Sequence, residues 1–294
     1  MIIDSLIKNK DISNLSNFNT KAYSKYYFEI NSRQDIDSIY EIYNYALKNN
    51  LKLLFVAWGT NLLFAFDIFD WIIIKNNLSW WTYNSETKIL ESYSNELISD
   101  ISESLLNDSR QVLWKRFIWL PWSIWWAIFW NAGCFWLETE NNFVEAELLD
   151  LETWKRTILD REEMKFNYRT SIIKETNKYF IIKIQFDLSK LVEKYSSDVD
   201  NLYFREHKQP KGNTCGSFFK NPSRENSAWK LIEEVWLKWN KIWWAFFSDK
   251  HANFLMNDGT ATYTDLLDLI KLAQEKVKGT YNVDLVPEVR IIFN

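Results

Sequence analysis

The chain of 294 residues is long enough for two or three domains and a sizeable core. Its 35 basic and 39 acidic side chains give a formal net charge of −4, which offers no electrostatic reason to expect nucleic-acid binding. Two cysteines exclude a disulfide framework and indicate a reducing compartment, the cytoplasm. No stretch of about 18 residues is apolar and uncharged, and the start lacks a signal-peptide pattern, so no membrane association is expected.

Glycine and tryptophan occur in abnormal numbers. Glycine appears 6 times, although average usage of about 7% would give roughly 20, and tryptophan appears 17 times. In LPWSIWWAIFWNAGCFW (120–136) the tryptophans follow a proline or flank small residues, in contexts that favour a residue without a Cβ. We therefore interpret most of these tryptophans as glycine positions. If the lineage reads UGA as glycine, a standard translation prints tryptophan at each UGA codon. The alternative is a set of genuine tryptophans that form a stacking surface.

The first elements of the chain are short apolar runs around one amphipathic stretch. Residues 1–20 are polar and are expected to form a loosely ordered N-terminal segment. A strand is predicted at 26–30, and an amphipathic helix at 32–50 with Ser32 as its N-cap. The apolar run 51–57 predicts a buried strand.

The middle of the chain is rich in predicted strands. A strand is expected at 71–76 and a helix at 96–106. Three strands are expected between 144 and 187, which completes an α+β domain ending near residue 190. The polar segment 188–212 is then predicted to be a connector.

The last third of the chain predicts a second α+β domain. Helices are expected at 227–235 and 263–279, and Gly279 is expected to end the second one. Residues 245–257 are predicted to form strands and loops, and a closing strand is predicted at 288–293.

A series of motifs becomes recognisable when glycine replaces tryptophan. FVAWGTNLLF (55–64) becomes a strand and a Gly-Gly-Thr-Asn turn, and 120–136 becomes a Pro-Gly-Ser-Ile-Gly-Gly-Ala stretch. The later motifs are NYRTSIIK (167–174), CGSFFKNP (215–222), AWKLIE (228–233), SDKHANFLMN (248–257) and PEVR (287–290). In this order the chain resembles the UDP-N-acetylenolpyruvoylglucosamine reductases, the MurB family, in its shorter type and from about Asn19 to the C-terminus. Trp80 and Trp81 match family glycines least well.

The resemblance implies a fold and a domain division. It is α+β, with an FAD-binding region of two subdomains like that of the vanillyl-alcohol oxidases (the PCMH type), followed by a C-terminal α+β substrate-binding domain. After the N-terminal segment 1–20, the FAD-binding domain is expected at 21–190 and the C-terminal domain at 203–294.

The two glycine-rich stretches match the family's FAD-binding segments. A pyrophosphate accepts hydrogen bonds from successive backbone N–H groups, which converge on it only if no side chain intervenes. The alternative for each stretch is a simple connecting turn. The expected cofactor contacts are Trp58, Gly59, Thr60, Asn61, Leu62, Trp122, Ser123, Trp126, Asn131 and Ala132.

The resemblance also implies the catalytic residues. Arg169 matches the arginine that stabilises the enol intermediate, Ser217 the general acid and Glu288 the third catalytic residue. Tyr168, Lys220 and Asn221 are expected to contact the substrate. Without the resemblance, each of these motifs would indicate only an ordinary turn or strand end.

The implied activity is the NADPH-dependent reduction of UDP-N-acetylglucosamine enolpyruvate through FAD, which forms UDP-N-acetylmuramate for peptidoglycan synthesis. A cytoplasmic monomer without bound metal or nucleic acid is expected. Another FAD oxidoreductase of the same fold is an alternative, and so is a flavin-free binding protein if the tryptophans are genuine.

Overall fold

The computed structural model describes residues 5–134, 136–190, 203, 206–207, 209–223 and 225–294. The chain divides into two compact units. The first comprises Met1–Ser5, Phe28–Trp58 and Ile74–Arg205, and the second comprises Leu6–Tyr27, Gly59–Ile73 and Glu206–Asn294, as far as these ranges are described. Most of the predicted connector, 191–202, 204–205 and 208, lies outside the described residues.

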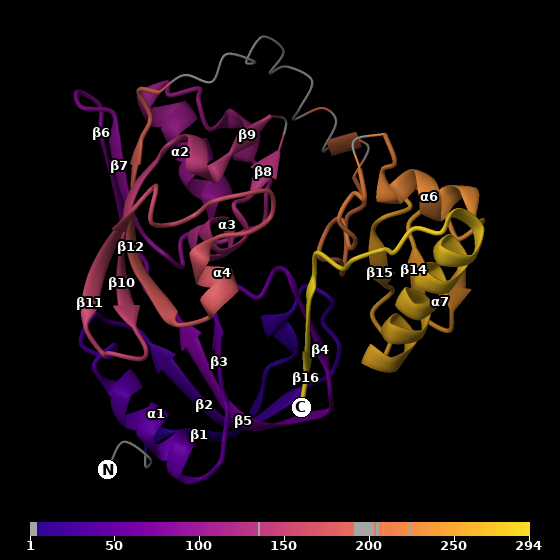
Figure 1. Cartoon of the computed structure of the whole chain (residues 1–294), viewed down its shortest axis with the longest axis horizontal. Helices are drawn as coiled ribbons and strands as arrows, with labels where there is room; N and C mark the ends of the chain where they lie inside the picture. The colour runs from indigo at the N-terminus through magenta and orange to yellow at the C-terminus, as the bar shows by residue number, and fades with distance from the viewer. Residues whose placement is uncertain (1–4, 135, 191–202, 204–205, 208, 224) are drawn as a thin grey trace. The chain divides into compact units, whose positions relative to one another are not determined.

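The first unit is built on a five-stranded antiparallel sheet with the order β11-β10-β12-β7-β6 (Figure 1). Its strands are β6 (Trp81–Asn84), β7 (Ile89–Tyr93), β10 (Phe143–Asp150), β11 (Arg156–Asp160) and β12 (Tyr179–Asp187). Phe180, Ile182 and Ile184 of the central strand are buried, because an inner strand has a neighbour on both sides. The strands expected between 144 and 187 are thereby confirmed.

The described part of the first unit includes four α-helices. They are α1 (Ser38–Lys48), α2 (Ile98–Ser109), α3 (Ile124–Trp130) and α4 (Ile172–Thr176), with short 3-10 turns at Lys115–Phe117 and Thr139–Asn141. The helix expected at 32–50 is present, but it begins later and Asp37 is its N-cap, because Ser32 closes a separate turn with Asp35. A two-stranded ribbon of β8 (Gly133–Cys134) and β9 (Leu137–Glu138) follows α3.

A second sheet has the strand order β1-β2-β5-β3. Its strands are β1 (Ile7–Asp11), β2 (Tyr23–Ile30), β3 (Leu53–Val56) and β5 (Ile68–Asn76), and both β2 and β5 contribute residues to the two units. The expectation of a loosely ordered segment at 1–20 is wrong from Ile7 onward. β1 pairs with β2, and all its side chains are exposed. An exposed strand needs no apolar alternation, so the polar run IKNKD gave no sign of a strand.

The described part of the second unit includes a three-stranded sheet, a parallel strand pair and the helices α6 and α7 (Figure 1). The sheet has the order β13-β14-β15, and the pair joins β4 to β16. Their bounds are β4 (Leu62–Ala65), β13 (Lys241–Ile242), β14 (Ala245–Phe247), β15 (Leu255–Asn257), β16 (Arg290–Phe293), α6 (Ala228–Glu234) and α7 (Tyr263–Tyr281), with a 3-10 turn at Ser13–Leu15. One apolar cluster, which includes Phe218, Phe247 and Leu269, forms the core.

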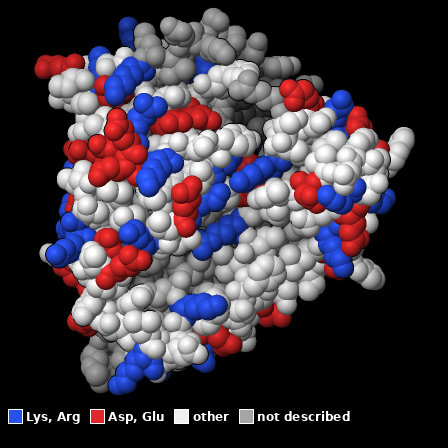
Figure 2. All heavy atoms as spheres, viewed as in Figure 1, with Lys and Arg blue, Asp and Glu red and all other residues white. Residues whose placement is uncertain are grey.

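The end of α7 differs from the prediction. Gly279 lies inside the helix, and Asn282 with a φ of 56° is the C-cap, because asparagine also tolerates the left-handed conformation. Among the described residues, no helix combines the length and apolarity needed to cross a membrane. Acidic and basic side chains are interspersed on the face that Figure 2 shows.

Candidate active site

The turn between β3 and β4 contains a glycine that cannot be replaced without a clash. Gly59 has a φ of +66°, and a Cβ at this position would lie 1.7 Å from the carbonyl oxygen of Leu15. The turn therefore requires glycine for both its backbone angle and its close packing. Thr60, Asn61 and Leu62, which follow it, are all buried.

Asn61 ties this turn to the strand that follows PEVR. Its Nδ2 donates to the carbonyl oxygen of Glu288 at 3.0 Å, and its own carbonyl oxygen accepts from the N–H of Arg290 at 3.0 Å. Its Oδ1 is buried and has no hydrogen-bond partner in the structure. A buried amide oxygen without a donor indicates that a ligand or water completes this position.

Ser217 and Glu288 lie on neighbouring backbone segments of the second unit. The N–H of Glu288 donates to the carbonyl oxygen of Phe218 at 2.7 Å, and Phe219 pairs with Pro287. Ser217 is exposed, whereas Glu288 is only 8% exposed. The structure thus brings together two predicted catalytic residues and the Gly59–Leu62 turn.

Asn253 holds the Ser217 segment from the other side. Its Oδ1 accepts from the N–H of Phe219 at 2.9 Å, and its Nδ2 donates to the carbonyl oxygen of the same residue at 2.8 Å. Asn253 is buried, so this paired contact is shielded from water. Sequence reasoning quoted the motif SDKHANFLMN but gave Asn253 no role.

The predicted substrate residues of this unit have structural contacts. The N–H of Lys220 donates to the carbonyl oxygen of Val286 at 2.9 Å, and Asn221 Oδ1 accepts from the N–H of Ala228 at the start of α6. Burial raises the pKa of the Cys215 thiol, whose Sγ contacts the carbonyl oxygen of Leu62, so Cys215 fits a packing role.

In the first unit, Trp58 lies over a buried lysine. Trp58 Nε1 donates to the carbonyl oxygen of Asn95 at 2.7 Å, and Lys75 Nζ lies 5.5 Å from the centroid of the indole. Burial lowers the pKa of Lys75 to about 8. The side-chain oxygen of Asn95 is buried without a partner. Sequence reasoning missed Lys75, because a lysine inside a strand gives no sign of its burial.

The second predicted FAD stretch forms α3 and its flanks. Ser123 is the N-cap, and its Oγ accepts from the N–H of Trp126 at 3.2 Å. Trp122 is partly buried, Trp126 is buried, and the carbonyl oxygen of Ala132 accepts from both the N–H and the Oγ1 of Thr139. Asn131 ends the helix with a φ of 45°.

Tyr168 and Arg169 are the two central residues of a tight turn between Asn167 and Thr170 in the same unit. Arg169 has a φ of 55°, and its Nη2 donates to the carbonyl oxygen of Gly133 at 3.0 Å. Tyr168 is about half exposed, and its ring centroid lies 5.0 Å from the guanidinium carbon of Arg169. Arg169 belongs to the first unit, and Ser217 and Glu288 belong to the second.

Comparisons with known proteins identify the family. The family model for the C-terminal domain of UDP-N-acetylenolpyruvoylglucosamine reductase matches residues 208–292. The reductase of Bacillus pumilus is 31% identical over 268 residues, which cover 88% of this chain and 86% of that protein. The reductase of Prochlorococcus marinus is 30% identical over 289 residues, which cover 96% of each. The chain belongs to the UDP-N-acetylenolpyruvoylglucosamine reductase family.

A solved structure of a family member shows the same fold. The crystal structure of UDP-N-acetylenolpyruvylglucosamine reductase (MurB) from Thermus caldophilus has a TM-score of 0.76 with this chain at 19% identity. The match covers 97% of this chain and 99% of that one. The predicted α+β fold of a MurB-type reductase is therefore confirmed.

The two predicted FAD stretches contain a buried amide oxygen without a partner and several bulky indoles. The missing Cβ of Gly59 leaves room for the carbonyl oxygen of Leu15, and the polar atom of this turn that calls for a ligand or water is the buried Oδ1 of Asn61. Trp58, Trp122 and Trp126 bring bulky rings into the same stretches. The Trp126 ring stacks on Phe129 with centroids 4.9 Å apart and an interplanar angle of 6°, yet its buried Nε1 has no partner.

Six tryptophans of the reductase have the backbone conformation of glycine. They are Trp119, Trp136, Trp154, Trp236, Trp239 and Trp243, with φ between 50° and 69°. In the described chain tryptophan is as frequent as asparagine among non-glycine residues with positive φ, although bulky residues rarely adopt this conformation. Trp236 and Trp243 are also 86% and 78% exposed, so no packing compensates for the strain.

Trp114 differs from these six. It is fully buried, its Nε1 donates to Asn142 Oδ1 at 3.2 Å, and its ring packs edge-on against Phe117 and Phe186. Its φ is −92°. These are the contacts of a tryptophan selected for its ring and its N–H group.

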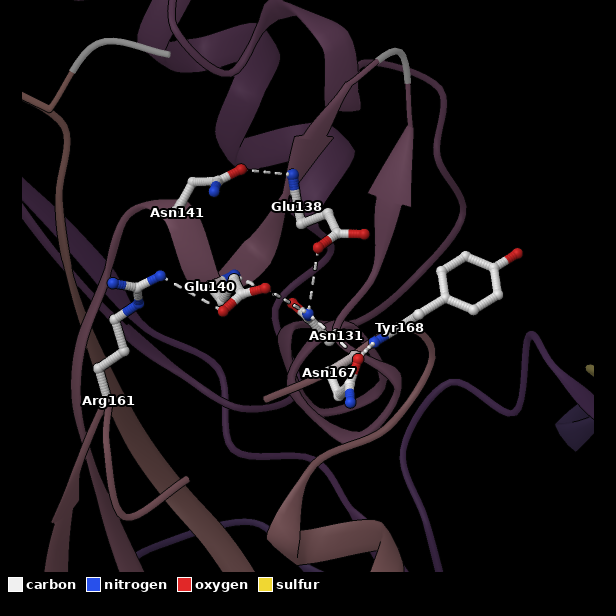
Figure 3. A network of polar contacts seen from close by, with 7 residues as sticks. All are labelled: Asn131, Glu138, Glu140, Asn141, Arg161, Asn167 and Tyr168. Atoms are coloured by element: carbon white, nitrogen blue, oxygen red, sulfur yellow. Dashed lines mark hydrogen bonds and ion pairs between the residues drawn. The ribbon is translucent and has the colours of Figure 1, made fainter. Parts of the chain in front are cut away.

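No group of three or more His, Cys, Asp or Glu side chains within the described part of the reductase has an arrangement that could hold a metal ion. The polar network around Asn131, drawn in Figure 3, was also missed by sequence reasoning. Its members are separated by up to 37 positions in the chain, and no local sequence pattern predicts contacts between residues so far apart.

Proposed function

We propose that this chain catalyses the NADPH-dependent reduction of UDP-N-acetylglucosamine enolpyruvate to UDP-N-acetylmuramate in peptidoglycan precursor synthesis. The observation that carries the proposal is the pairing of the Ser217 and Glu288 segments, which Asn61 joins to the Gly59 turn. This pairing places Ser217 and Glu288 on adjacent segments, next to the turn that contains the unpaired Oδ1 of Asn61. Bound FAD supplies the hydride transfer from NADPH to the vinyl carbon of the substrate.

The residues of the chain supply the proton and the electrostatic stabilisation. The Ser217 hydroxyl donates a proton to the carbon next to the one that receives the hydride. Glu288, which is buried, lies on the adjoining segment. Its carboxyl orients the hydroxyl proton of Ser217 for transfer. The permanently charged guanidinium of Arg169 stabilises the enolate form of the intermediate. Tyr168, Lys220 and Asn221 contact the sugar nucleotide.

We further propose that the working protein carries glycine at every tryptophan position except Trp114. A chain with these glycines is termed the glycine form. Glycine removes the strain at the six positions with positive φ and the bulk from both predicted FAD stretches. Trp114 is excluded because its indole satisfies a buried amide oxygen.

The residue at each position is measured directly by tandem mass spectrometry of peptides from the protein isolated from its own cells. The proposal expects glycine at 119, 136, 154, 236, 239 and 243 and tryptophan at 114. Tryptophan at the six positions, or glycine at 114, would contradict it.

The activity is tested by comparing the glycine form with the printed chain after incubation with FAD. The glycine form is expected to retain flavin absorbance through gel filtration and to oxidise NADPH only when the enolpyruvyl substrate is present. Retained flavin without substrate-dependent turnover would instead support another FAD oxidoreductase of this fold. Absence of flavin from the glycine form and from the native protein would support the flavin-free binding protein.

The domain division and the location are also proposals. We propose that 21–190 hold FAD and that 203–294 bind the sugar nucleotide, in a monomer. Neither cysteine, Cys134 or Cys215, forms a disulfide, which suits a reducing compartment such as the cytoplasm.

A further inference from the structure

A network of carboxyl and amide groups lies beside Arg169 and has no role in the reaction as proposed. Its centre is Asn131, a fully buried residue at the end of α3. Asn131 Nδ2 donates to Glu138 Oε2 at 3.4 Å, to Glu140 Oε1 at 3.1 Å and to the carbonyl oxygen of Asn167 at 3.3 Å (Figure 3). Its Oδ1 accepts from the N–H of Glu140 at 3.1 Å. One amide therefore joins two carboxylates to the turn that contains Arg169.

The turn itself is held from several sides. Asn167 Oδ1 accepts from the N–H of Tyr168 at 2.7 Å, and Lys174 Nζ donates to the carbonyl oxygen of Arg169 at 2.8 Å. The φ of 55° at Arg169 is rare for a residue with a long side chain. A conformation of this kind persists when surrounding contacts determine it, as they do here.

Gly133 brings Glu138 and Arg169 close together. A Cβ at this glycine would lie 2.8 Å from Glu138 Cγ, 3.3 Å from Glu138 Oε1 and 3.2 Å from Arg169 Nη1. The same glycine accepts a hydrogen bond from Arg169 Nη2 through its carbonyl oxygen. The carboxyl and the guanidinium therefore both border the space that a Cβ at Gly133 would occupy.

The charges around this pair explain its orientation. Burial and the neighbouring Glu140 raise the pKa of Glu138, while Arg169 and Asn131 act in the opposite direction. Glu140 in turn is paired with Arg161 at 3.4 Å on the exposed side. Arg169 is thus the cation that favours the ionised form of the Glu138 carboxyl.

We propose that Glu138 is a positioning residue for Arg169. Its carboxyl, which Asn131 holds in place, fixes the guanidinium against Gly133 so that its remaining donors keep one direction toward the enolate oxygen or carboxylate of the substrate. This inference rests on the proposed function of Arg169. A misplaced catalytic group lowers the rate without abolishing binding of the cofactor.

The test separates the two half-reactions of the glycine form. Glu138→Gln retains the shape of the side chain and removes its charge. It is expected to leave flavin content and the rate of flavin reduction by NADPH within twofold of the parent. Reoxidation of the flavin by the enolpyruvyl substrate is expected to slow by about tenfold to a hundredfold, mainly in kcat. Arg161→Gln, at the exposed end of the network, is the matched control and is expected to change neither half-reaction.

A double-mutant cycle with Arg169→Ala tests whether Glu138 acts through the arginine. Once Arg169 is absent, Glu138→Gln is expected to have no further effect on reoxidation. An equal slowing with and without Arg169 would overturn the proposal, and so would an unchanged rate in Glu138→Gln alone. If the parent itself is not reoxidised by the substrate, the proposed function fails, which is a different result.

Discussion

Single residues of this chain carry constraints that can be read from local geometry. Gly59 needs a positive φ and a missing Cβ at once, whereas Gly279 has space around it and lies inside α7. Lys75 is a cation buried beneath an aromatic ring. These three positions give predictions in which a matched residue elsewhere in the chain serves as the control.

Gly59→Ala is expected to destabilise the protein by several kcal/mol, because the added methyl meets a backbone oxygen and the residue must retain a φ of +66°. Gly279→Ala should instead stabilise it by up to about 1 kcal/mol, because alanine is the better helix former and no atom lies within 4 Å. Urea unfolding of both variants measures the difference. Equal unfolding midpoints would show that the turn can relax.

In the chain with tryptophan at position 58, Lys75 predicts a dependence of stability on pH. Its pKa is lowered from 10.5 to about 8 in the folded state, so between these values the unfolded chain holds the proton more tightly. The free energy of unfolding should then rise with pH through this window, by about 3 kcal/mol for this group. Lys75→Met is expected to remove that rise and to stabilise the protein at pH 7.

The measurement is urea unfolding at several pH values between 7 and about 10.5. Lys276→Met, on the exposed face of α7, is the control and should leave the dependence of the wild type unchanged. If the free energy of unfolding of Lys75→Met rose with pH as much as that of the parent chain, the rise would come from other titrating groups.

At the scale of elements, the site depends on contacts that connect distant segments. β4 pairs in parallel with β16, and the Ser217 segment pairs with the residues just before β16. Asn253 fixes that segment through both polar groups of Phe219. The orientation of Ser217 and Glu288 therefore depends on an asparagine that does not itself react.

Asn253→Ala should cost about 2–4 kcal/mol of stability, because it leaves the buried N–H and C=O of Phe219 without partners. In the glycine form it should also slow flavin reoxidation by substrate more than flavin reduction by NADPH. Asn226→Ala, at an exposed turn, is the control, with a change within about 0.5 kcal/mol. Thermal unfolding and stopped-flow absorbance measure the two effects, and a fully stable Asn253→Ala variant would contradict this account.

At the scale of the whole molecule, the tryptophans fall into two kinds. Trp236→Gly should raise stability by about 1 kcal/mol or more. Trp236 has a φ of 61° and an exposed indole, so the substitution removes backbone strain without removing buried contacts. Trp114→Gly should lower it by at least about 3–5 kcal/mol, because it leaves a large cavity and an unpaired Asn142 oxygen. Denaturant unfolding of both single variants makes the comparison, and a loss of stability in each would contradict the distinction.

Much of the architecture was predictable, because periodic patterns are local. The amphipathic helices α1 and α7 and the apolar strands β10 and β12 follow directly from their residues. β1 was missed because its side chains are all exposed and show no apolar alternation. The pairing of β4 with β16 was missed because no local sequence pattern connects residues 62 and 290. At the site, the motifs led to Ser217, Glu288 and Arg169, whereas Asn253 and Glu138 act through contacts that only the fold creates.

The tryptophans that we propose to be glycine in the working protein also have a consequence for producing it. If they correspond to UGA codons, a host that reads UGA as stop ends synthesis at the first such codon, and Trp58 is the first tryptophan of the chain. The fragment would contain β1, β2, α1 and β3 but neither β4 nor any residue of the Ser217 and Glu288 segments. Laboratory expression therefore requires a gene rewritten with glycine codons, and the unaltered gene functions only in cells that share its code.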